Sequence, residues 1–249
     1  MKCSQSRRER RFLLLAGIKR LGLTGHPSGI SSALDRIANV VIINVLVNQV
    51  SSEEKEIELT LQGEEAERHI AKLLKPLVGR GGQLFSRLDE NKLRIKDDAG
   101  LDILLNLSGI RFAISVKSKR YEKVKVFYDP KYDQIRYSCK EYRKDWFPKD
   151  ITKEINDQIN WLLTNRPKLF SKKKQPKKPW LIVVVCGVPS KPVKQPPRVA
   201  VFPNSPKEVI NGTEYLKHRG VFVVDEESLI SLVQVLKTQP NEEYVPSQK

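Results

Sequence analysis

One continuous apolar run, "WLIVVVCGV" between Pro179 and Pro189, constrains the fold more than any other stretch of the chain. A strand with one wet face alternates apolar and polar residues, whereas an unbroken run rich in Val and Ile indicates a strand covered on both faces. Such a strand belongs in the middle of a sheet that lies between helices. With 249 residues, enough for one large domain, the sequence predicts an α/β fold, a mixed β-sheet flanked by helices.

Three segments show the apolar spacing of amphipathic helices. The first begins at Gly63, the second follows Asp150 and the third follows Asp225, and the two aspartates are expected to cap their helices. The apolar stripes contain Ala66, Ile70, Leu73, Leu74 and Leu77 in the first helix, and Ile151, Ile155, Ile159 and Leu162 or Leu163 in the second. Trp146, Phe147 and Trp161 are expected in the core or at its edge, and the alternative is that they are exposed and stack on bases.

Residues 101–107 and 111–117 alternate well enough to predict a hairpin, with Ser108-Gly109 as its turn. A third strand is predicted in "KVKVFYDPKYDQIRYSCK", and a fourth pairs with it if the chain turns at Asp129-Pro130. The segments "RVAVF" and "GVFVVD" predict two short strands, and "GRGGQLFSRL" reads as a glycine-rich connection. Residues 1–50 are interpreted as a basic, partly helical appendage, 51–238 as the α/β domain with a Lys/Pro-rich loop at 166–198, and 239–249 as a disordered tail.

The net charge of +16 indicates a polyanionic partner, and nucleic acid is the commonest polyanion. No Asp or Glu occurs between Gln158 and Lys207, although lysines and arginines are frequent there. A one-signed segment of this kind suits contacts with phosphates, and a solvated basic surface is the alternative. The residues predicted to bind nucleic acid are Lys119, Arg120, Lys172, Lys173, Lys174, Lys177 and Lys178.

Several other classes of protein are disfavoured. No apolar run approaches the roughly 20 residues that cross a membrane, and the basic N-terminus lacks a signal-peptide cleavage site. Three cysteines without CxxC spacing and three histidines suggest neither a disulfide framework nor a zinc site. The cytoplasm is therefore the expected location, with no membrane partner, and a homodimer is left open.

Strand parity predicts one cluster of side chains that could carry chemistry. If 101–107 and 111–117 pair around Ser108-Gly109, Asp102 and Ser115 face each other across the hairpin, and Lys117 shares the face of Ser115. On the preceding helix Glu67 lies at the border of the apolar face, with Glu64 as second choice. An acid, a hydroxyl and an amine are thus expected together, within reach of a helix carboxylate.

The order G-x-x-x-E on a helix (Gly63 to Glu67), Asp102 in a hairpin and x-x-Lys at Lys117 resembles the PD-(D/E)XK nuclease superfamily, closest to nuclease-related-domain and Holliday-junction-resolvase-like proteins. The similarity covers about half of the chain, from about Gly63 to the strand near Val188. It implies a restriction-endonuclease-like core, Glu67 and Asp102 as ligands of Mg²⁺ or Mn²⁺, and Lys117 as the amine that positions the attacking water. Clustered carboxylates suit Mg²⁺, which prefers hard oxygen ligands.

The sequence departs from this pattern at Ser115, where the resemblance implies a second acid. A neutral hydroxyl removes one negative charge from the metal site, so Mg²⁺ affinity should fall. Glu122, or Asp97 and Asp98 before Asp102, are the candidate replacements. The leading hypothesis is a Mg²⁺-dependent nuclease that hydrolyses DNA phosphodiester bonds. The alternatives are a catalytically degenerate nuclease fold that binds DNA, and a basic scaffold protein that binds no nucleic acid.

Overall fold

The computed structural model of the chain describes residue 54 and residues 57–86, 101–138, 150–170 and 177–242. Contacts divide the chain into two units, Met1–Ile57 and Glu58–Lys249. The expected appendage, 1–50, lies outside the described residues. Part of the expected disordered tail belongs to the fold, because the buried Asn241 side chain accepts a hydrogen bond from Arg111 N over 2.7 Å and donates one to Arg111 O over 3.2 Å.

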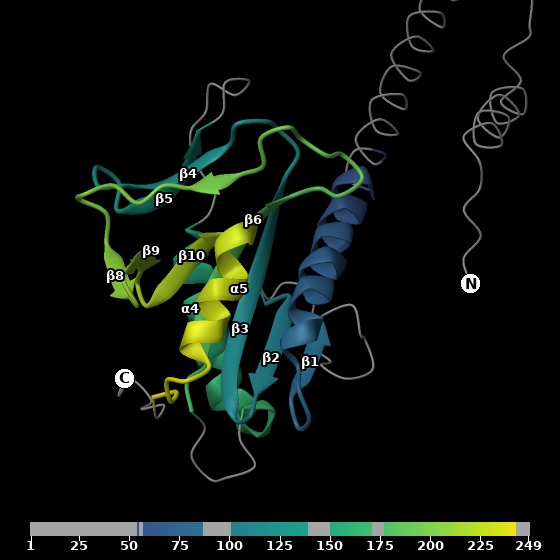
Figure 1. Cartoon of the computed structure of the whole chain (residues 1–249), viewed down its shortest axis with the longest axis vertical. Coiled ribbons are helices and arrows are strands. Elements are labelled where there is room, and N and C mark those ends of the chain that lie inside the picture. Colours follow the sequence, from purple (N-terminus) through teal and green to yellow (C-terminus); the bar gives the residue numbers. More distant parts are fainter. Residues whose placement is uncertain (1–53, 55–56, 87–100, 139–149, 171–176, 243–249) are drawn as a thin grey trace, which may run out of the picture. The chain divides into compact units, whose positions relative to one another are not determined.

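A seven-stranded mixed sheet forms the centre of the second unit, in the order β1-β2-β3-β6-β10-β9-β8 (Figure 1). Strands β3, β6 and β10 run parallel to one another, and antiparallel hairpins extend the sheet at both sides. The strands are β1 Gln83–Ser86, β2 Ile103–Leu107, β3 Ile110–Lys119, β6 Trp180–Gly187, β8 Lys207–Ile210, β9 Thr213–His218 and β10 Val221–Asp225. The apolar run at 180–188 is therefore the central strand, as predicted, and Leu181–Cys186 are buried. The loop predicted at 166–198 is wrong over this stretch, because β6 lies inside it.

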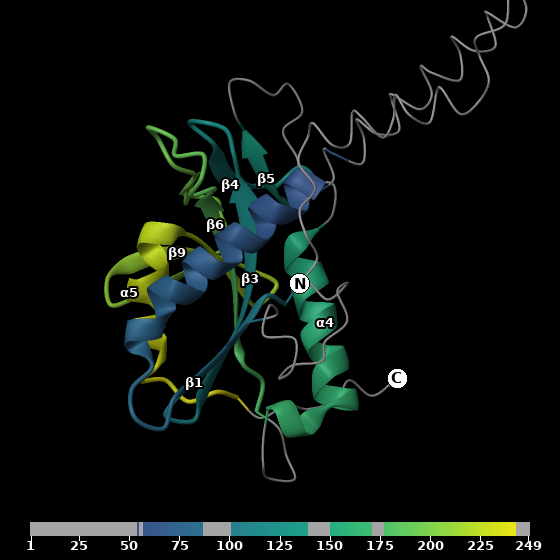
Figure 2. The same ribbon diagram turned by 90° about the vertical axis from the view of Figure 1, so that its right-hand side faces the viewer.

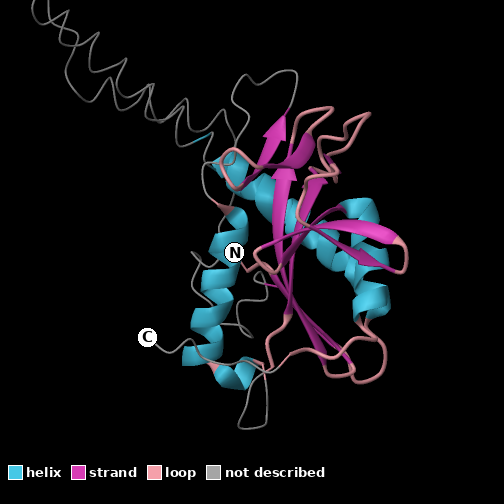
Figure 3. Cartoon of the chain, turned by 90° about the vertical axis from the view of Figure 1, so that its left-hand side faces the viewer, coloured by secondary structure: helices cyan, strands magenta, loops and turns pink. Residues whose placement is uncertain are grey.

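Helices cover both faces of this sheet (Figures 2 and 3). Helix α4, Ile151–Asn165, packs Ile155 and Ile159 against a core that includes Val183 of β6. The helix formed by residues 57–74 and helix α5, Glu226–Leu236, pack on the opposite face, in a core that includes Ile182. The 3₁₀ turns Lys75–Leu77 and Pro167–Leu169 follow the first helix and α4. The predicted α/β class, a mixed sheet flanked by helices, is confirmed.

A second, three-stranded sheet, in the order β5-β4-β7, lies beyond the end of β3 (Figure 1). Its strands are β4 Lys125–Asp129, β5 Gln134–Ser138 and β7 Arg198–Val199. The predicted third and fourth strands do pair with each other, around a turn at residues 129–134. One face of this sheet packs on the core at the α4 side, because Val126 and Ile135 are buried there.

The predicted helices are confirmed, with one corrected boundary. Asp150 caps α4 by accepting hydrogen bonds from the backbone N–H groups of Thr152 and Lys153, and Asp225 caps α5 through Ser228 N. The first helix already includes residues 57–62, so Gly63 is an interior residue of that helix and not its start. Trp161 was expected at the core edge, but it is 52% exposed because it lies on the opposite side of α4 from Ile155, Ile159 and Leu162.

Tight turns close three of the hairpins. Both central residues have positive φ at Ser108-Gly109 (52° and 92°), and the same holds at Asn211-Gly212 and Arg219-Gly220. Such turns match the twist of the strands that they join and favour Asn or Gly. The turn predicted at Ser108-Gly109 is confirmed. The β8–β9 hairpin lies where the sequence analysis predicts no strand, although Asn-Gly is a strong hairpin signal, and β1 lies in the segment predicted to be a glycine-rich connection.

Candidate functional site

The carboxylate of Asp102 is held inside the hairpin by two donors from β3. The backbone N–H of Val116 donates to Asp102 Oδ2 over 2.6 Å, and the hydroxyl of Ser115 donates to the same oxygen over 3.3 Å. The register Ile103↔Ile114 places Asp102 opposite Ser115, as strand parity predicted. Asp102 is only 8% exposed and Ser115 1% exposed. The acid and the hydroxyl are thus in contact, but in a closed environment.

Lys117 and Lys119 continue the same side of β3 beyond Ser115. In the parallel ladder with β6 Ser115 pairs with Val183 and Lys117 with Val185, both of which belong to the core on the α4 side. Lys119 lies with its ammonium group 4.5 Å from the centre of the Tyr137 ring. Burial, and then the charge of Lys117, lower the pKa of Lys119 to about 8. The end of β3 therefore brings two lysine side chains together in a partly dehydrated place.

Glu67 comes to the sheet from the other side. Its helix packs Ala66, Ile70 and Leu74 into the core that contains Ile114 and Val116, on the face opposite Ser115 and Lys117. Glu67 is itself buried. The structure therefore unites Asp102, Ser115 and Lys117 along one hairpin, but it places the helix of Glu67 on the other face of the sheet.

The described ranges contain no group of three or more His, Cys, Asp or Glu side chains arranged to hold a metal ion. Of the candidate replacements for the missing acid, Glu122 lies after the end of β3 and accepts a long hydrogen bond, 3.5 Å, from the backbone N–H of Lys194. Asp97 and Asp98 lie outside the described residues. Strand β3 offers Asp102 the hydroxyl of Ser115 and the backbone N–H of Val116, at the place where the resemblance implies a second acid.

The residues predicted to contact nucleic acid are spread over two places. Lys119 ends β3 and Arg120 follows it; Arg120 is exposed, and its guanidinium donates to Tyr121 Oη over 2.9 Å. Lys177 and Lys178 precede β6, and Lys177 is exposed. Lys172, Lys173 and Lys174 lie outside the described residues.

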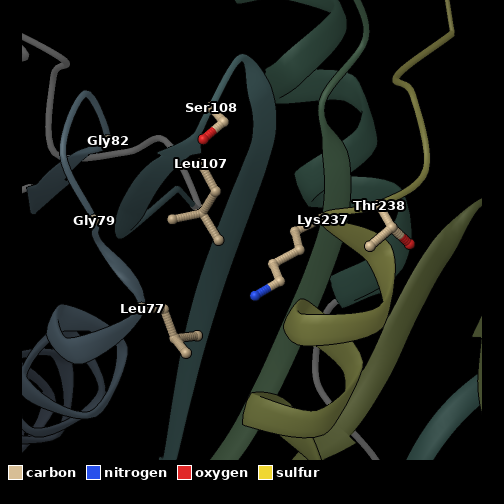
Figure 4. Close-up of a pocket in the computed structure, with 7 residues that line it drawn as sticks. All are labelled: Leu77, Gly79, Gly82, Leu107, Ser108, Lys237 and Thr238. Atoms are coloured by element: carbon tan, nitrogen blue, oxygen red, sulfur yellow. The ribbon is translucent and has the colours of Figure 1, made fainter.

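A separate hollow of about 300 Å³ lies at the other end of the β2–β3 hairpin, between the first helix and α5 (Figure 4). It is lined by Leu77, Gly79, Gly82, Leu107, Ser108, Lys237 and Thr238. Figure 4 shows the ammonium group of Lys237 pointing toward the space between Leu77 and Leu107. Lys237 alone among these lining residues is charged, so the hollow offers no acid–base pair.

The structure contains a hydrogen-bonded chain of polar side chains that the sequence analysis did not predict. Thr152 Oγ1 lies 2.9 Å from His218 Nδ1, and His218 Nε2 lies 2.9 Å from Asp133 Oδ1. Arg219 joins this chain through ion pairs of 2.8 Å with Asp133 and with Asp150. Hydrogen bonds from Arg219, Tyr128 and His218 hold the pKa of the Asp133 carboxyl well below its usual range.

The order hydroxyl, imidazole and carboxylate in this chain is that of a nucleophile with its base. However, the Thr152 hydroxyl is fully buried and also donates to Asp150 Oδ1 over 2.8 Å, so a substrate could not reach it. The chain connects the β4–β5 turn to α4 and to the β9–β10 turn. These residues lie 66 and 85 positions apart, so no local pattern in the sequence could have shown the contact.

None of the described helices is both long and apolar enough to span a bilayer. Comparison of the chain with protein-family models, with curated proteins and with solved structures returns no match.

Proposed function

We propose that this protein binds DNA, in the cytoplasm, through a nuclease-like scaffold whose hydrolytic site is degenerate. The observation that carries the proposal is the pair of hydrogen bonds from Ser115 Oγ and Val116 N to one oxygen of Asp102. A metal ligand needs lone pairs that face the ion, and Mg²⁺ also keeps several waters around it. The Asp102 carboxylate is only 8% exposed and is hydrogen-bonded to its own hairpin, so it offers few free lone pairs to an ion and little room for the waters of that ion.

The order of elements supports the nuclease-like scaffold. The first helix is followed by β1 and by the antiparallel hairpin of Asp102 and Lys117; after β4 and β5 come a second helix, α4, and β6, a strand parallel to β3. This is the order in which the resemblance places its motifs. The disagreement lies at Ser115 and in the face that the helix of Glu67 covers, and both concern the metal site more than the scaffold.

The cations of the hairpin support DNA as the ligand. Lys117 forms no ion pair with any acid in the described ranges, and Lys119 lies next to it with a lowered pKa. Two neighbouring ammonium groups repel each other in the free protein, and a phosphate between them would remove that repulsion. The net charge of +16 favours the same polyanionic class of ligand.

Mg²⁺-dependent hydrolysis of DNA phosphodiester bonds is the second candidate, because Asp102 is bonded to β3 at Val116, next to Lys117. In that case Asp102 would hold Mg²⁺ or Mn²⁺ without the help of Glu67, because the helix of Glu67 packs on the other face of the sheet. The ion would lower the pKa of a bound water and offset charge on the phosphate, and Lys117 would orient that water.

A binding assay tests the first candidate. Fluorescence anisotropy with labelled duplex DNA should show binding that weakens steeply with NaCl, since phosphate contacts release counterions. Lys117→Ala with Lys119→Ala should reduce the affinity about tenfold or more and reduce the salt slope by about two. Lys153→Ala is the matched control, because Lys153 is an exposed lysine on α4 paired with Asp157. Salt-independent binding, or equal losses in the control, would contradict the proposal.

A cleavage assay separates the two candidates. Plasmid and branched DNA are incubated with native protein, Asp102→Asn and Lys117→Ala in Mg²⁺ or Mn²⁺. Equal, background cleavage by all three proteins supports binding without hydrolysis. Metal-dependent cutting by the native protein that both substitutions abolish would establish the nuclease instead.

A further inference from the structure

The two faces of the second sheet differ in character. One face packs on the core, and the outer face carries aromatic and cationic side chains. On β4 Val126 and Tyr128 pack toward the core, so Lys125 and Phe127 lie on the opposite face. On β5 the core residue Ile135 likewise leaves Arg136 on the outer face, and Arg136 is the register partner of Phe127. Rings and cations are therefore neighbours on a surface that the core does not use.

Direct contacts form two groups, one of Lys125, Phe127 and Phe202 and one of Lys131, Tyr132 and Arg136. The cross-strand pair Phe127–Arg136 makes the two groups neighbours, and together they are called the aromatic strip. The rings of Phe127 and Phe202 meet edge to face with 6.1 Å between their centres, and Lys125 Nζ lies 4.9 Å from the centre of Phe202. At the other end the Arg136 guanidinium lies 3.9 Å from the centre of the Tyr132 ring. Lys131 Nζ approaches the Tyr132 ring at 5.1 Å.

The strip is accessible and cationic. Tyr132 is 49% exposed and Phe202 40% exposed, so both rings are open to solvent. Arg136 is paired with Asp129 over 3.1 Å. Lys125 and Lys131, by contrast, form no ion pair with an acid in the described ranges. The neighbouring Arg198 pairs with Glu227 and adds no charge. Two lysines thus leave the strip with a net positive charge.

Rings that alternate with cations match a ligand in which flat bases alternate with phosphates. Exposed aromatic side chains in a basic groove stack on the bases of single strands, and base stacking tolerates any sequence. In a duplex the base faces are already stacked on each other and cannot reach the rings. The strip therefore suits single-stranded nucleic acid better than a duplex.

We propose that the aromatic strip binds single-stranded nucleic acid, with Phe202 and Tyr132 stacking on bases and Lys125 and Lys131 contacting phosphates. This inference rests on the proposed function as a DNA-binding protein. It adds the form of the nucleic acid and a binding surface separate from the hairpin of Asp102 and Lys117.

Anisotropy measurements with labelled oligo-dT, an abasic oligonucleotide of equal length and a duplex test the proposal. Native protein should bind oligo-dT more tightly than the abasic strand. Phe202→Ala with Tyr132→Ala should weaken oligo-dT binding about tenfold or more and change duplex binding less than twofold. Phe202→Tyr keeps a ring and should preserve affinity. Val209→Ala is the control, because Val209 is an exposed apolar side chain on β8, outside the strip.

The outcomes separate this inference from the proposed function. Lys117-dependent duplex binding with no effect of the strip substitutions on oligo-dT would overturn the inference and leave the proposed function standing. Binding to neither oligonucleotide nor duplex would overturn both. Strip-dependent binding to vesicles of phosphatidylserine and phosphatidylcholine, without oligo-dT binding, would overturn the inference in favour of a membrane ligand.

Discussion

The hydroxyl of Ser115 donates a hydrogen bond to Asp102 Oδ2 over 3.3 Å, at a point where both residues are buried between β2 and β3. The same oxygen accepts from the backbone N–H of Val116. The acid therefore satisfies donors of its own hairpin, and this relationship makes a stability role for Asp102 testable independently of any activity.

Asp102→Ala should lower the free energy of unfolding by about 1–3 kcal/mol, because it leaves the buried Val116 N–H without its acceptor. Ser115→Ala removes only one hydroxyl donor and should cost about 0.5–1.5 kcal/mol. Urea denaturation followed by circular dichroism measures both. An Asp102→Ala protein as stable as the native one would show that these hydrogen bonds contribute nothing.

Ser115→Glu introduces the acid that the nuclease resemblance implies, and it should destabilise the protein by about 3 kcal/mol, since a second carboxylate would be buried beside Asp102. The measurement is thermal unfolding with and without Mg²⁺ at about 10 mM, a concentration about a hundredfold above the dissociation constant of a weak Mg²⁺ site. A melting temperature that is unchanged by Mg²⁺ agrees with a degenerate site. Specific Mg²⁺ stabilisation of Ser115→Glu, absent in native protein, would show that the scaffold can still hold the ion.

Lys119 should make stability depend on pH in the alkaline range. Its pKa is about 8 in the folded protein and 10.5 for an ordinary lysine, so between these values the unfolded chain binds more protons and stability rises with pH. Lys119→Met lacks this titration. The stability of Lys119→Met relative to native protein should therefore fall as the pH rises from 7 to 10. Denaturation midpoints at several pH values measure this difference, and a constant difference would contradict the lowered pKa.

Two glycines should respond in opposite ways to alanine. Gly63→Ala should stabilise the protein by about 0.5–1 kcal/mol, because Gly63 lies inside a helix and its added Cβ meets no atom within 4 Å. Gly109→Ala should destabilise it by about 1 kcal/mol or more, since Gly109 has φ +92° in the β2–β3 turn. Thermal or urea unfolding tests the pair. Equal effects at the two positions would contradict the assigned helix or the assigned turn.

Cys186 should resist thiol reagents in the native protein. It lies buried in β6, and burial, with a smaller effect of Glu226, raises the pKa of its thiol to about 12. Since the thiolate is the reactive form, alkylation at neutral pH should be negligible until the protein unfolds. Mass spectrometry of the peptide that contains Cys186, after iodoacetamide treatment in buffer and in urea, gives the comparison. Rapid native labelling would indicate that β6 is accessible.

Local patterns predicted much of the fold. The apolar run at 180–188, the aspartate caps at 150 and 225 and the Ser108-Gly109 turn all act over a few residues, and the structure contains each of them. The β8–β9 hairpin carries a local signal of the same kind at Asn211-Gly212. Strand β1 carried less, because it is only four residues long and follows a glycine-rich segment.

For the candidate site, local rules were enough to predict that Asp102 and Ser115 meet, because side chains alternate with a period of two and the turn sets the register. The surroundings of this pair depend on contacts between distant parts of the chain. Packing buries Ser115 on the α4 side, places the helix of Glu67 on the other face, and turns β4 and β5 into a second sheet with Phe127 and Arg136 outside. These outcomes depend on which surfaces cover one another across distant parts of the chain, and no local period of the sequence encodes that choice.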